Sequence, residues 1–256
     1  MQEGQGDRQD DGHGRGPGAE RRDGPRAARR EWMVSRLYAG GQGGTLDPDG
    51  APTGIFKSPL DAPVRVSVQG LHGDWHADPR VHGGPDKAVH LYPADHYRAL
   101  VDAYPGGAPS LRPGSLGENL SVGGIAEDEA CIGDVVRLGS TLLQVSQPRS
   151  PCWKINRRFD IDGLSLHMAR RRITGWYYRV LEEGVIAPGD PMVFVERPPG
   201  AVTIDRFWRV QLAEQPSIDA LRGLAAAPGL AADWRRRLAG RADWLAERDR
   251  AQGIRR

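Results

Sequence analysis

Short runs of β-type residues, each closed by a Gly- or Pro-containing turn, recur from Trp32 to Val195, and this alternation most restricts the fold. Residues 64–68 alternate apolar and polar side chains strictly, as a half-buried strand does. Residues 134–138 and 141–146 flank the turn Gly139-Ser140 and predict a hairpin. Further strands are expected at residues 32–38, 54–57, 89–92, 176–181 and 192–195. Many short strands with few helices predict a β-barrel or a strongly curved sheet.

Helical periodicity is confined to a few segments of this region. Pro93 is expected to open a helix whose apolar face carries Tyr97, Leu100 and Tyr104. A second helix is expected over residues 163–174, with Gly175 as its C-cap.

The character of the sequence changes after Arg197-Pro198-Pro199-Gly200. Three helical stretches are expected near residues 204–214, 218–226 and 230–239. The chain is therefore predicted to be mainly β with some α. A β-barrel-like domain at 32–197 is followed by a small three-helix domain at 201–246 and a flexible tail at 247–256. Residues 1–31 are rich in Gly and Arg with almost no apolar residue, so a disordered tail is expected there.

Composition argues against several classes of protein. The net charge is only +2, which argues against a dedicated nucleic-acid binder. No apolar run is long enough to span a bilayer, and the N-terminus lacks the apolar core of a signal peptide. Cys131 and Cys152 are too few for a disulfide scaffold, so a cytoplasmic protein with free thiols is expected.

Residues 147–154, Gln-Pro-Arg-Ser-Pro-Cys-Trp-Lys, hold the most suggestive side chain. Two prolines end the preceding strand, because proline has no N–H to donate and favours a rigid turn. Cys152 follows on that turn, with Arg149 and Lys154 close by in sequence. Nearby cations favour the thiolate, which is both a nucleophile and a metal ligand. The alternative is a buried, inert cysteine, which is the better interpretation of Cys131.

The loop over residues 70–87 contains several possible zinc ligands. They are His72, His76, Asp78 and His82. A zincin-type pair needs a helix to place both imidazoles on one face, yet Gly73 and Pro79 interrupt this segment and the Glu of that motif is missing. The motif therefore argues against zinc.

The same loop better fits an anion site built from backbone. Gly83 and Gly84 let the chain approach a ligand closely, and exposed N–H groups can form an anion-binding nest. Lys87 would add a point charge suited to phosphate. The alternative is a tight turn in which Asp86 and Lys87 are merely solvated.

A second loop, Gly117-Glu118-Asn119-Leu120, offers a carboxylate and an amide. In isolation such a pair is more often a turn stabilised by local side-chain hydrogen bonds than a catalytic site.

Taken together and in this order, three segments resemble the MOSC-domain family, and within it the YiiM-like subgroup. They are Gly73-Asp74 with His82-Gly83-Gly84-Pro85-Asp86-Lys87, then Gly114 and Gly117-Glu118-Asn119-Leu120, then Gln147-Pro148-Arg149 with Pro151-Cys152 and Lys154. The resemblance covers about residues 32–196. Residues 201–244 resemble the C-terminal three-helix extension of that subgroup.

This resemblance implies a MOSC β-barrel-like fold that holds the molybdenum cofactor (Mo-molybdopterin), with Cys152 as the protein ligand to the metal. The residues it implies for cofactor binding are Lys57, Gly83, Gly84, Asp86, Lys87, Arg149 and Lys154. Asn119, Glu118 or His82 would supply protons or orient the substrate. MOSC domains are also associated, at the family level, with binding of pyridoxal phosphate.

The YiiM-like subgroup implies reduction of N-hydroxylated compounds, such as 6-N-hydroxylaminopurine, to amines. Because the chain shows no convincing nucleotide-binding motif, electrons would come from a separate flavoprotein. The three-helix domain could dock that donor, pair two subunits into a homodimer or simply stabilise the barrel. One rival function is a molybdenum cofactor or sulfur carrier without turnover. The other is a non-catalytic binder of nucleic acid or acidic partners, which the near-zero net charge argues against.

Overall fold

Seven strands of the described chain close into a barrel, which confirms the predicted fold class. The computed structural model describes residue 1 and residues 30–107 and 109–253. Around the barrel the order is β13 (Pro191–Glu196), β9 (Val135–Leu138), β10 (Thr141–Pro148), β11 (Trp176–Glu182), β7 (Val89–Pro93), β8 (Leu120–Val122) and β1 (Glu31–Ala39). Pairing of β1 with β13 closes the ring, so neither of these strands is left as an open edge there.

The barrel is mixed and carries short additional strands. β7 and β8 run parallel, whereas the other neighbouring pairs of the ring are antiparallel. β4 (Ser58–Leu60) extends the ring from β1. Two small sheets stand beside it: β12 (Gly184–Ile186) with β5 (Val64–Ser67) and β6 (Gly70–Leu71), and β2 (Thr45–Leu46) with β3 (Ala51–Pro52).

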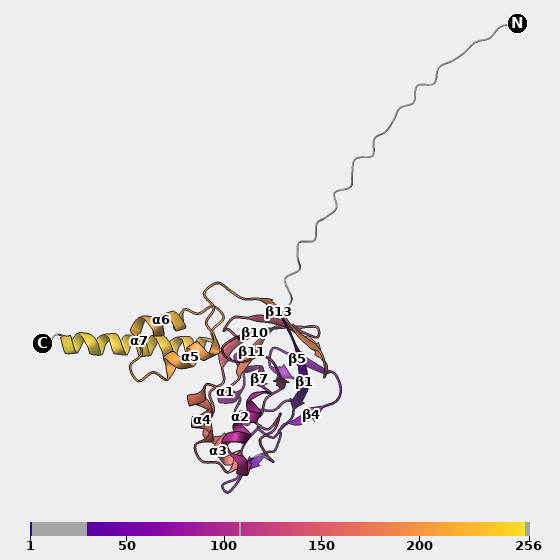
Figure 1. Cartoon of the computed structure of the whole chain (residues 1–256), viewed down its shortest axis with the longest axis horizontal. Coiled ribbons are helices and arrows are strands. Elements are labelled where there is room, and N and C mark those ends of the chain that lie inside the picture. Colours follow the sequence, from indigo (N-terminus) through magenta and orange to yellow (C-terminus); the bar gives the residue numbers. More distant parts are fainter. Residues whose placement is uncertain (2–29, 108, 254–256) are drawn as a thin grey trace.

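Helices cover the barrel at two places. The connections hold α1 (Pro79–His82), η1 (Pro85–Lys87), α2 (His96–Ala103), η2 (Pro105–Gly107), α3 (Trp153–Phe159) and α4 (Leu164–Arg171). The predicted C-terminal helices are α5 (Ile204–Gln211), α6 (Ile218–Ala225) and α7 (Ala232–Gly253). Figure 1 shows α5, α6 and α7 gathered at one side of the barrel, with α2, α3 and α4 together at another.

The C-terminal helices share a hydrophobic core with the barrel. One buried cluster contains Leu138 and Trp176 of the strands together with Phe207 and Trp234 of the helices. Trp208 fixes the junction, because its indole N–H donates to the Thr174 hydroxyl over 2.9 Å. A second buried cluster lies under α2, α3 and α4. The three-helix unit is therefore packed onto the barrel as a part of its core.

Several local predictions were wrong. Residues 54–57 are not a strand: the Lys57 N–H donates back to Ile55 O, and β4 begins only at Ser58. Pro93 ends β7, and the next helix begins at His96. Gly175 does not cap α4, since Arg172 takes the left-handed C-cap conformation. Gly175 instead lies so close to β7 that a Cβ there would be 2.3 Å from Leu91 O.

The helix boundaries also correct the expected ends of the chain. α3 was not predicted, because most of its residues are polar or charged and only Ile155 and Phe159 are buried, which is too few for a clear helical periodicity. α7 continues to Gly253, so residues 247–253 are helical where a flexible tail was expected. Of the tail expected to be disordered at residues 1–31, residues 2–29 lie outside the described chain, as do residues 254–256. Glu31 belongs instead to β1.

Candidate functional site

Two adjoining cavities meet at Cys152. One, called the inner cavity because the buried residues His90, Asn119 and Arg149 line it, has a volume of about 80 Å³. The other, called the outer cavity because the exposed residues Arg80, Asp233 and Arg237 border it, has a volume of about 260 Å³. The inner cavity is lined by Thr53, Gly54, Ile55, Lys57, Trp75, His76, Ala77, His82, His90, Leu116, Gly117, Asn119, Arg149, Cys152, Lys154 and Tyr177. The outer cavity is lined by Arg80, His82, Lys87, Gln147, Ser150, Pro151, Cys152, Tyr177, Asp233, Trp234 and Arg237. Cys152, His82 and Tyr177 therefore lie between the two spaces.

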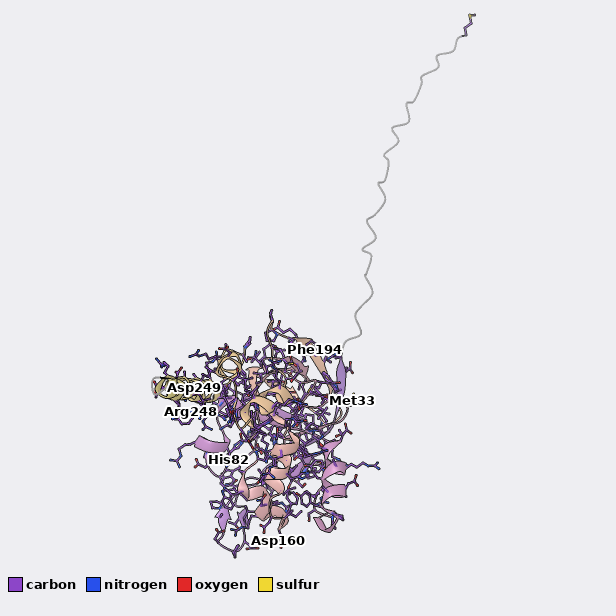
Figure 2. All side chains as sticks on the ribbon, turned by 60° about the vertical axis from the view of Figure 1, so that its left-hand side comes forward. Met33, His82, Asp160, Phe194, Arg248 and Asp249 are labelled. Atoms are coloured by element: carbon purple, nitrogen blue, oxygen red, sulfur yellow. The ribbon has the colours of Figure 1, made fainter. Side chains whose placement is uncertain are left out.

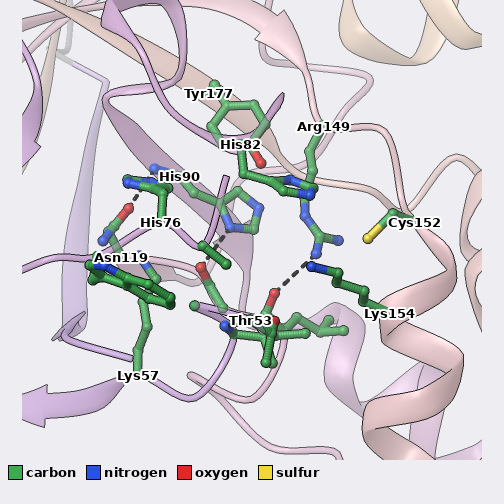
Figure 3. Close-up of a pocket in the computed structure, with 16 residues that line it drawn as sticks. Thr53, Lys57, His76, His82, His90, Asn119, Arg149, Cys152, Lys154 and Tyr177 are labelled. Carbon is green, nitrogen blue, oxygen red and sulfur yellow. Dashed lines mark hydrogen bonds between the residues drawn. The ribbon is translucent and has the colours of Figure 1, made fainter. Parts of the chain in front are cut away.

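Cys152 occupies a fixed position between a strand and a helix. β10 ends at Pro148, the Arg149 N–H then donates to Gly175 O over 3.1 Å, and Cys152 becomes the extended N-cap residue of α3. Its side chain is half-buried. Figure 3 shows its sulfur directed toward the ends of Arg149 and Lys154. The structure thus brings together the thiol and the two cations that the sequence placed beside it.

Cys131 differs from Cys152 in every respect that matters for binding. It is 3% exposed and lies in an isolated bridge to Thr203, and it lines neither cavity. Burial, together with the nearby Asp134 carboxylate, raises the pKa of its thiol. This agrees with its interpretation as an inert core residue.

The surroundings of Cys152 are cationic. Arg149 is 7% exposed, and the Lys154 ammonium donates to Pro52 O over 2.7 Å. Burial lowers the pKa of His82, and the charges of Lys154, Arg149 and Lys87 lower it further. Among the described residues, no carboxylate lines the inner cavity. Such a site favours ligands that carry negative charge.

His82 holds a position that connects the two cavities. It is the last residue of α1, and Figure 2 shows it at the left of the view, well apart from Met33 at the right. Because its pKa is lowered, its imidazole is largely neutral near neutral pH. It then carries one N–H and one lone pair, so it can take a proton from one side and give one to the other.

Asn119 is the centre of a buried polar network. Its amide donates to Asp74 Oδ2 over 2.9 Å and to Tyr38 O over 3.1 Å. Its side-chain oxygen accepts from the backbone N–H of His90 over 2.9 Å. Lys57 forms a buried ion pair with the same Asp74 carboxylate, and burial lowers the pKa of its ammonium. Lys57 thus lines the cavity with its charge already paired.

The glycine loop lies beside the outer cavity, and two of its N–H groups donate within the loop. The Gly83 N–H donates to Pro79 O over 3.1 Å, and the Lys87 N–H donates to Gly84 O over 2.9 Å. Neither glycine lines a cavity. Asp86 is likewise set apart, because its carboxylate pairs with Arg179 at 2.7 Å. Of this predicted cofactor loop, only Lys87 borders the outer space.

Glu118 agrees with the turn interpretation of its loop and not with the catalytic role that the resemblance implied. It is fully buried behind the cavity wall, and its carboxylate accepts from Tyr97 Oη (2.7 Å), Gly114 N (2.5 Å) and Leu116 N (3.2 Å). Burial raises its pKa. These three hydrogen bonds make Glu118 a clamp that holds the 114–119 loop in shape. Because its side chain is fully buried and lines neither cavity, it does not contact a substrate bound there.

Several lining residues were not predicted as parts of the site. His90 stands in β7, where all five residues are buried, and a histidine in such a strand was the signal that could have found it. Tyr177 is its cross-strand partner in β11, with ring centroids 5.0 Å apart. Asp233, Trp234 and Arg237 come from α7, and no sequence motif connects that helix with Cys152.

The described residues contain no group of three or more His, Cys, Asp or Glu side chains placed to hold a metal ion. Of the four possible zinc ligands, His76 and His82 line a cavity, whereas Asp78 caps α1 and pairs with Arg80. Within the same described part of the chain, none of the helices is both long enough and apolar enough to span a membrane.

Comparisons with known proteins agree on one family. The family model of the MOSC domain matches residues 78–193. YflK of Bacillus subtilis is 36% identical over 193 residues, covering 75% of this chain and 86% of YflK. YiiM of Escherichia coli is 35% identical over 206 residues, covering 78% of this chain and 92% of YiiM.

Two further proteins extend the comparison. A protein of Gibberella moniliformis named "Reductase" is 35% identical over 189 residues, which are 73% of this chain and 33% of that protein. The crystal structure of YiiM from Geobacillus stearothermophilus matches with a TM-score of 0.68 and 32% identity, covering 82% of this chain and 99% of that one.

Proposed function

The chain belongs to the MOSC-domain family as a homologue of YiiM, and from this we propose that it is a molybdenum-cofactor-dependent oxidoreductase. It would reduce N-hydroxylated compounds, such as 6-N-hydroxylaminopurine, to amines. The observation that carries the proposal is the half-buried Cys152 thiol, which stands where two cavities meet and faces Arg149 and Lys154. The reductase name of the fungal relative supports the reaction type.

The residues present fit a molybdenum cofactor. A thiolate is a soft ligand of the kind that a thiophilic metal selects, and Cys152 offers one sulfur at an accessible position. The cofactor is anionic through its phosphate, and the cavities present Lys87, Arg149, Lys154 and Arg237. Arginine and lysine are the usual partners of phosphate. Cys152 would hold the metal, and Lys87 and Arg237 of the outer cavity would hold the anionic part.

The proposed reaction needs two electrons and two protons. In balanced form, R–NHOH + 2 e⁻ + 2 H⁺ gives R–NH₂ + H₂O. When bound, the cofactor supplies the redox chemistry that breaks the N–O bond. A separate flavoprotein would supply the electrons. The protein must bind the substrate, limit access of water and deliver protons to the departing oxygen.

His82 is the proposed proton relay. It lines both cavities together with Cys152, and its lowered pKa keeps it able to accept a proton from the outer side. Proton transfer by a positioned side chain typically contributes about 10²–10⁴-fold to the rate. Asn119 lines the inner cavity, but its amide is engaged with Asp74 and Tyr38, so its role is to hold that wall in place.

Steady-state turnover tests this function. The protein, expressed in a host that makes the molybdenum cofactor, should reduce 6-N-hydroxylaminopurine to adenine with a dithionite-reduced dye as electron donor. Cys152→Ser should abolish turnover, and Cys131→Ser should leave it unchanged because Cys131 lines neither cavity. A wild-type protein that carries molybdenum but does not turn over would instead indicate a cofactor or sulfur carrier, since the same half-buried thiol would serve that role.

A further inference from the structure

The inner cavity contains a histidine whose hydrogen bonding is incomplete. His90 is 3% exposed, and its Nδ1 lies 3.2 Å from Gly117 O. A carbonyl oxygen can only accept, so Nδ1 carries the proton and Nε2 is left with a lone pair. Nε2 is buried without a partner in the described chain. The ring therefore presents a hydrogen-bond acceptor to the cavity that it lines.

Arg149 presents a complementary donor in the same cavity. Its Nη2 donates to Leu116 O over 3.0 Å, whereas Nη1 is buried and has no hydrogen-bond partner among the described residues. Arg149 and His90 both line the inner cavity, and the positive charge of Arg149 helps to lower the pKa of His90. A buried acceptor and a buried donor thus share one small space.

Leaving such atoms unpaired is costly. An unsatisfied buried polar group is destabilising, and buried polar groups in native proteins are nearly always hydrogen-bonded. A cavity of about 80 Å³ has room for water, since about 10–15 Å³ is enough to admit one molecule. A ligand with a matching N–H and acceptor would replace those waters without losing hydrogen bonds.

We propose that the inner cavity binds the planar heterocycle of the substrate, with His90 Nε2 accepting from a ligand N–H and Arg149 Nη1 donating to a neighbouring ring nitrogen or carbonyl oxygen. The aromatic side chains Trp75 and Tyr177 line the same cavity and suit a flat ring. This inference rests on the proposed function for the identity of the ligand as substrate.

The volumes of the two cavities support placing the substrate ring in the inner cavity and the cofactor in the outer one. The outer cavity, about 260 Å³ against about 80 Å³ for the inner one, leaves more room for a cofactor with a long anionic group. It also carries Lys87, Arg80 and Arg237. Cys152 stands between the two spaces. His90 and Arg149 then act as binding residues that choose the substrate by its hydrogen-bonding edge.

Two substitutions of His90 separate recognition from a structural role. Asparagine places its amide near the Nδ1 position, so His90→Asn keeps a donor for Gly117 O and removes the acceptor at Nε2. Glutamine reaches the Nε2 position, so His90→Gln keeps an acceptor there and loses the bond to Gly117. If His90 only supports the fold, His90→Asn should disturb the protein less than His90→Gln, because it keeps the bond to Gly117 O. If His90 binds the ligand, His90→Gln should keep more of the affinity for adenine than His90→Asn.

Isothermal titration of the full chain with adenine measures this order. Adenine carries an N–H beside a ring nitrogen and needs no electrons, so its binding does not depend on turnover. We expect wild type and His90→Gln to bind adenine within about threefold of each other, and His90→Asn to bind about tenfold or more weakly, the effect of one lost buried hydrogen bond. Circular dichroism checks that both variants are folded.

Three results would overturn the inference. They are no adenine binding at millimolar concentration, equal affinity of wild type and His90→Asn, and His90-dependent binding of pterin without binding of adenine. The last result would assign the cavity to the ring of the cofactor. The proposed function fails separately, by absence of molybdenum or turnover, and adenine binding with normal His90 dependence would survive that failure.

Discussion

Three histidines line the inner cavity, and each has a pKa lowered from its ordinary value by burial. They are His76, His82 and His90. For His90 the shift is large, and the charges of Arg149 and Lys57 add to the effect of burial. At the scale of single residues, the site is thus built to keep imidazoles neutral beside cations. Each neutral ring keeps a lone pair that can accept a hydrogen bond, and the lowered pKa values couple the stability of the fold to pH.

The neutral state of His90 predicts a loss of stability in mild acid. Its pKa in the folded chain is well below the ordinary value of 6.5, so below about pH 6.5 the unfolded chain binds more protons than the folded one. The free energy of unfolding must then fall as the pH falls. We expect urea unfolding between about pH 7.5 and pH 5.5 to show a smaller loss for His90→Gln than for wild type.

The control for that measurement lies in the remaining histidines. His76 and His82 are unchanged in the variant, and so are the carboxylates, so their contributions cancel in the comparison. A His90→Gln variant that loses as much stability as wild type over this range would contradict a neutral, buried His90.

Residues of the site differed in how far the sequence could reveal them. Cys152, Arg149 and Lys154 are adjacent in the chain, so proline turns and charge pointed to them directly. His90 and Tyr177 meet only because β7 pairs with β11, a pairing that no local pattern encodes. Glu118 became a candidate proton donor only through the family resemblance, whereas the turn interpretation from its own loop agrees with the backbone amides of Gly114 and Leu116 that donate to it.

At the scale of elements, the loop over residues 114–119 forms one wall of the inner cavity. Leu116, Gly117 and Asn119 line that cavity. Glu118 holds the loop in shape from behind, and Gly114 packs so closely on Tyr38 that a Cβ there would be 2.4 Å from the Tyr38 ring. The wall is thus positioned by a buried carboxylate and a close backbone approach.

Glu118→Gln should disturb this wall. The substitution replaces one accepting oxygen with an NH₂ group that faces N–H or O–H donors, so at least one buried donor loses its partner. We expect a loss of about 1–3 kcal/mol in the free energy of unfolding, measured by urea denaturation near neutral pH. Asp128→Asn, a substitution at an exposed carboxylate, is the control and should change stability by less than about 0.5 kcal/mol. Equal effects of the two substitutions would contradict the clamp.

The elements themselves were predictable where the pattern was strong. The hairpin of β9 and β10 follows from alternation around Gly139-Ser140, and the apolar face of α5 is evident in the sequence. The structure departs from the predicted elements where contacts between distant parts of the chain determine the local conformation. Residues 54–57 leave the strand pattern because the turn at Ile55 and the wall of the cavity fix their backbone. α3 forms from a mostly polar run because its two buried residues pack into the second core.

At the scale of the whole molecule, the barrel and the C-terminal helices act as one unit. A single hydrophobic cluster joins them, and α7 contributes Asp233, Trp234 and Arg237 to the outer cavity. Lys87 lies close enough to α7 for the charges of that helix to act on it: burial and Arg237 lower the pKa of Lys87, while Asp233 raises it. The sequence predicted both parts of the molecule, yet it could not show that the second completes a cavity at Cys152.

Two tryptophans of α7 test this dependence. Trp234 is 8% exposed and its ring lies 4.9 Å from that of Phe207, whereas Trp244 is 59% exposed. We expect Trp234→Ala to lower the free energy of unfolding by about 3 kcal/mol or more and also to reduce retention of cofactor. Trp244→Ala should change either quantity little. Urea denaturation and metal analysis measure the two effects, and equal effects of the two substitutions would contradict a shared core.

The most direct test of the whole account is molybdenum per chain, measured by elemental analysis after expression in a host that makes the cofactor. Wild type and Cys131→Ser should carry close to one molybdenum each, because Cys131 is buried away from both cavities. Cys152→Ser should carry almost none, since it lacks the sulfur proposed to hold the metal. Equal molybdenum in Cys152→Ser and wild type would contradict direct ligation by Cys152.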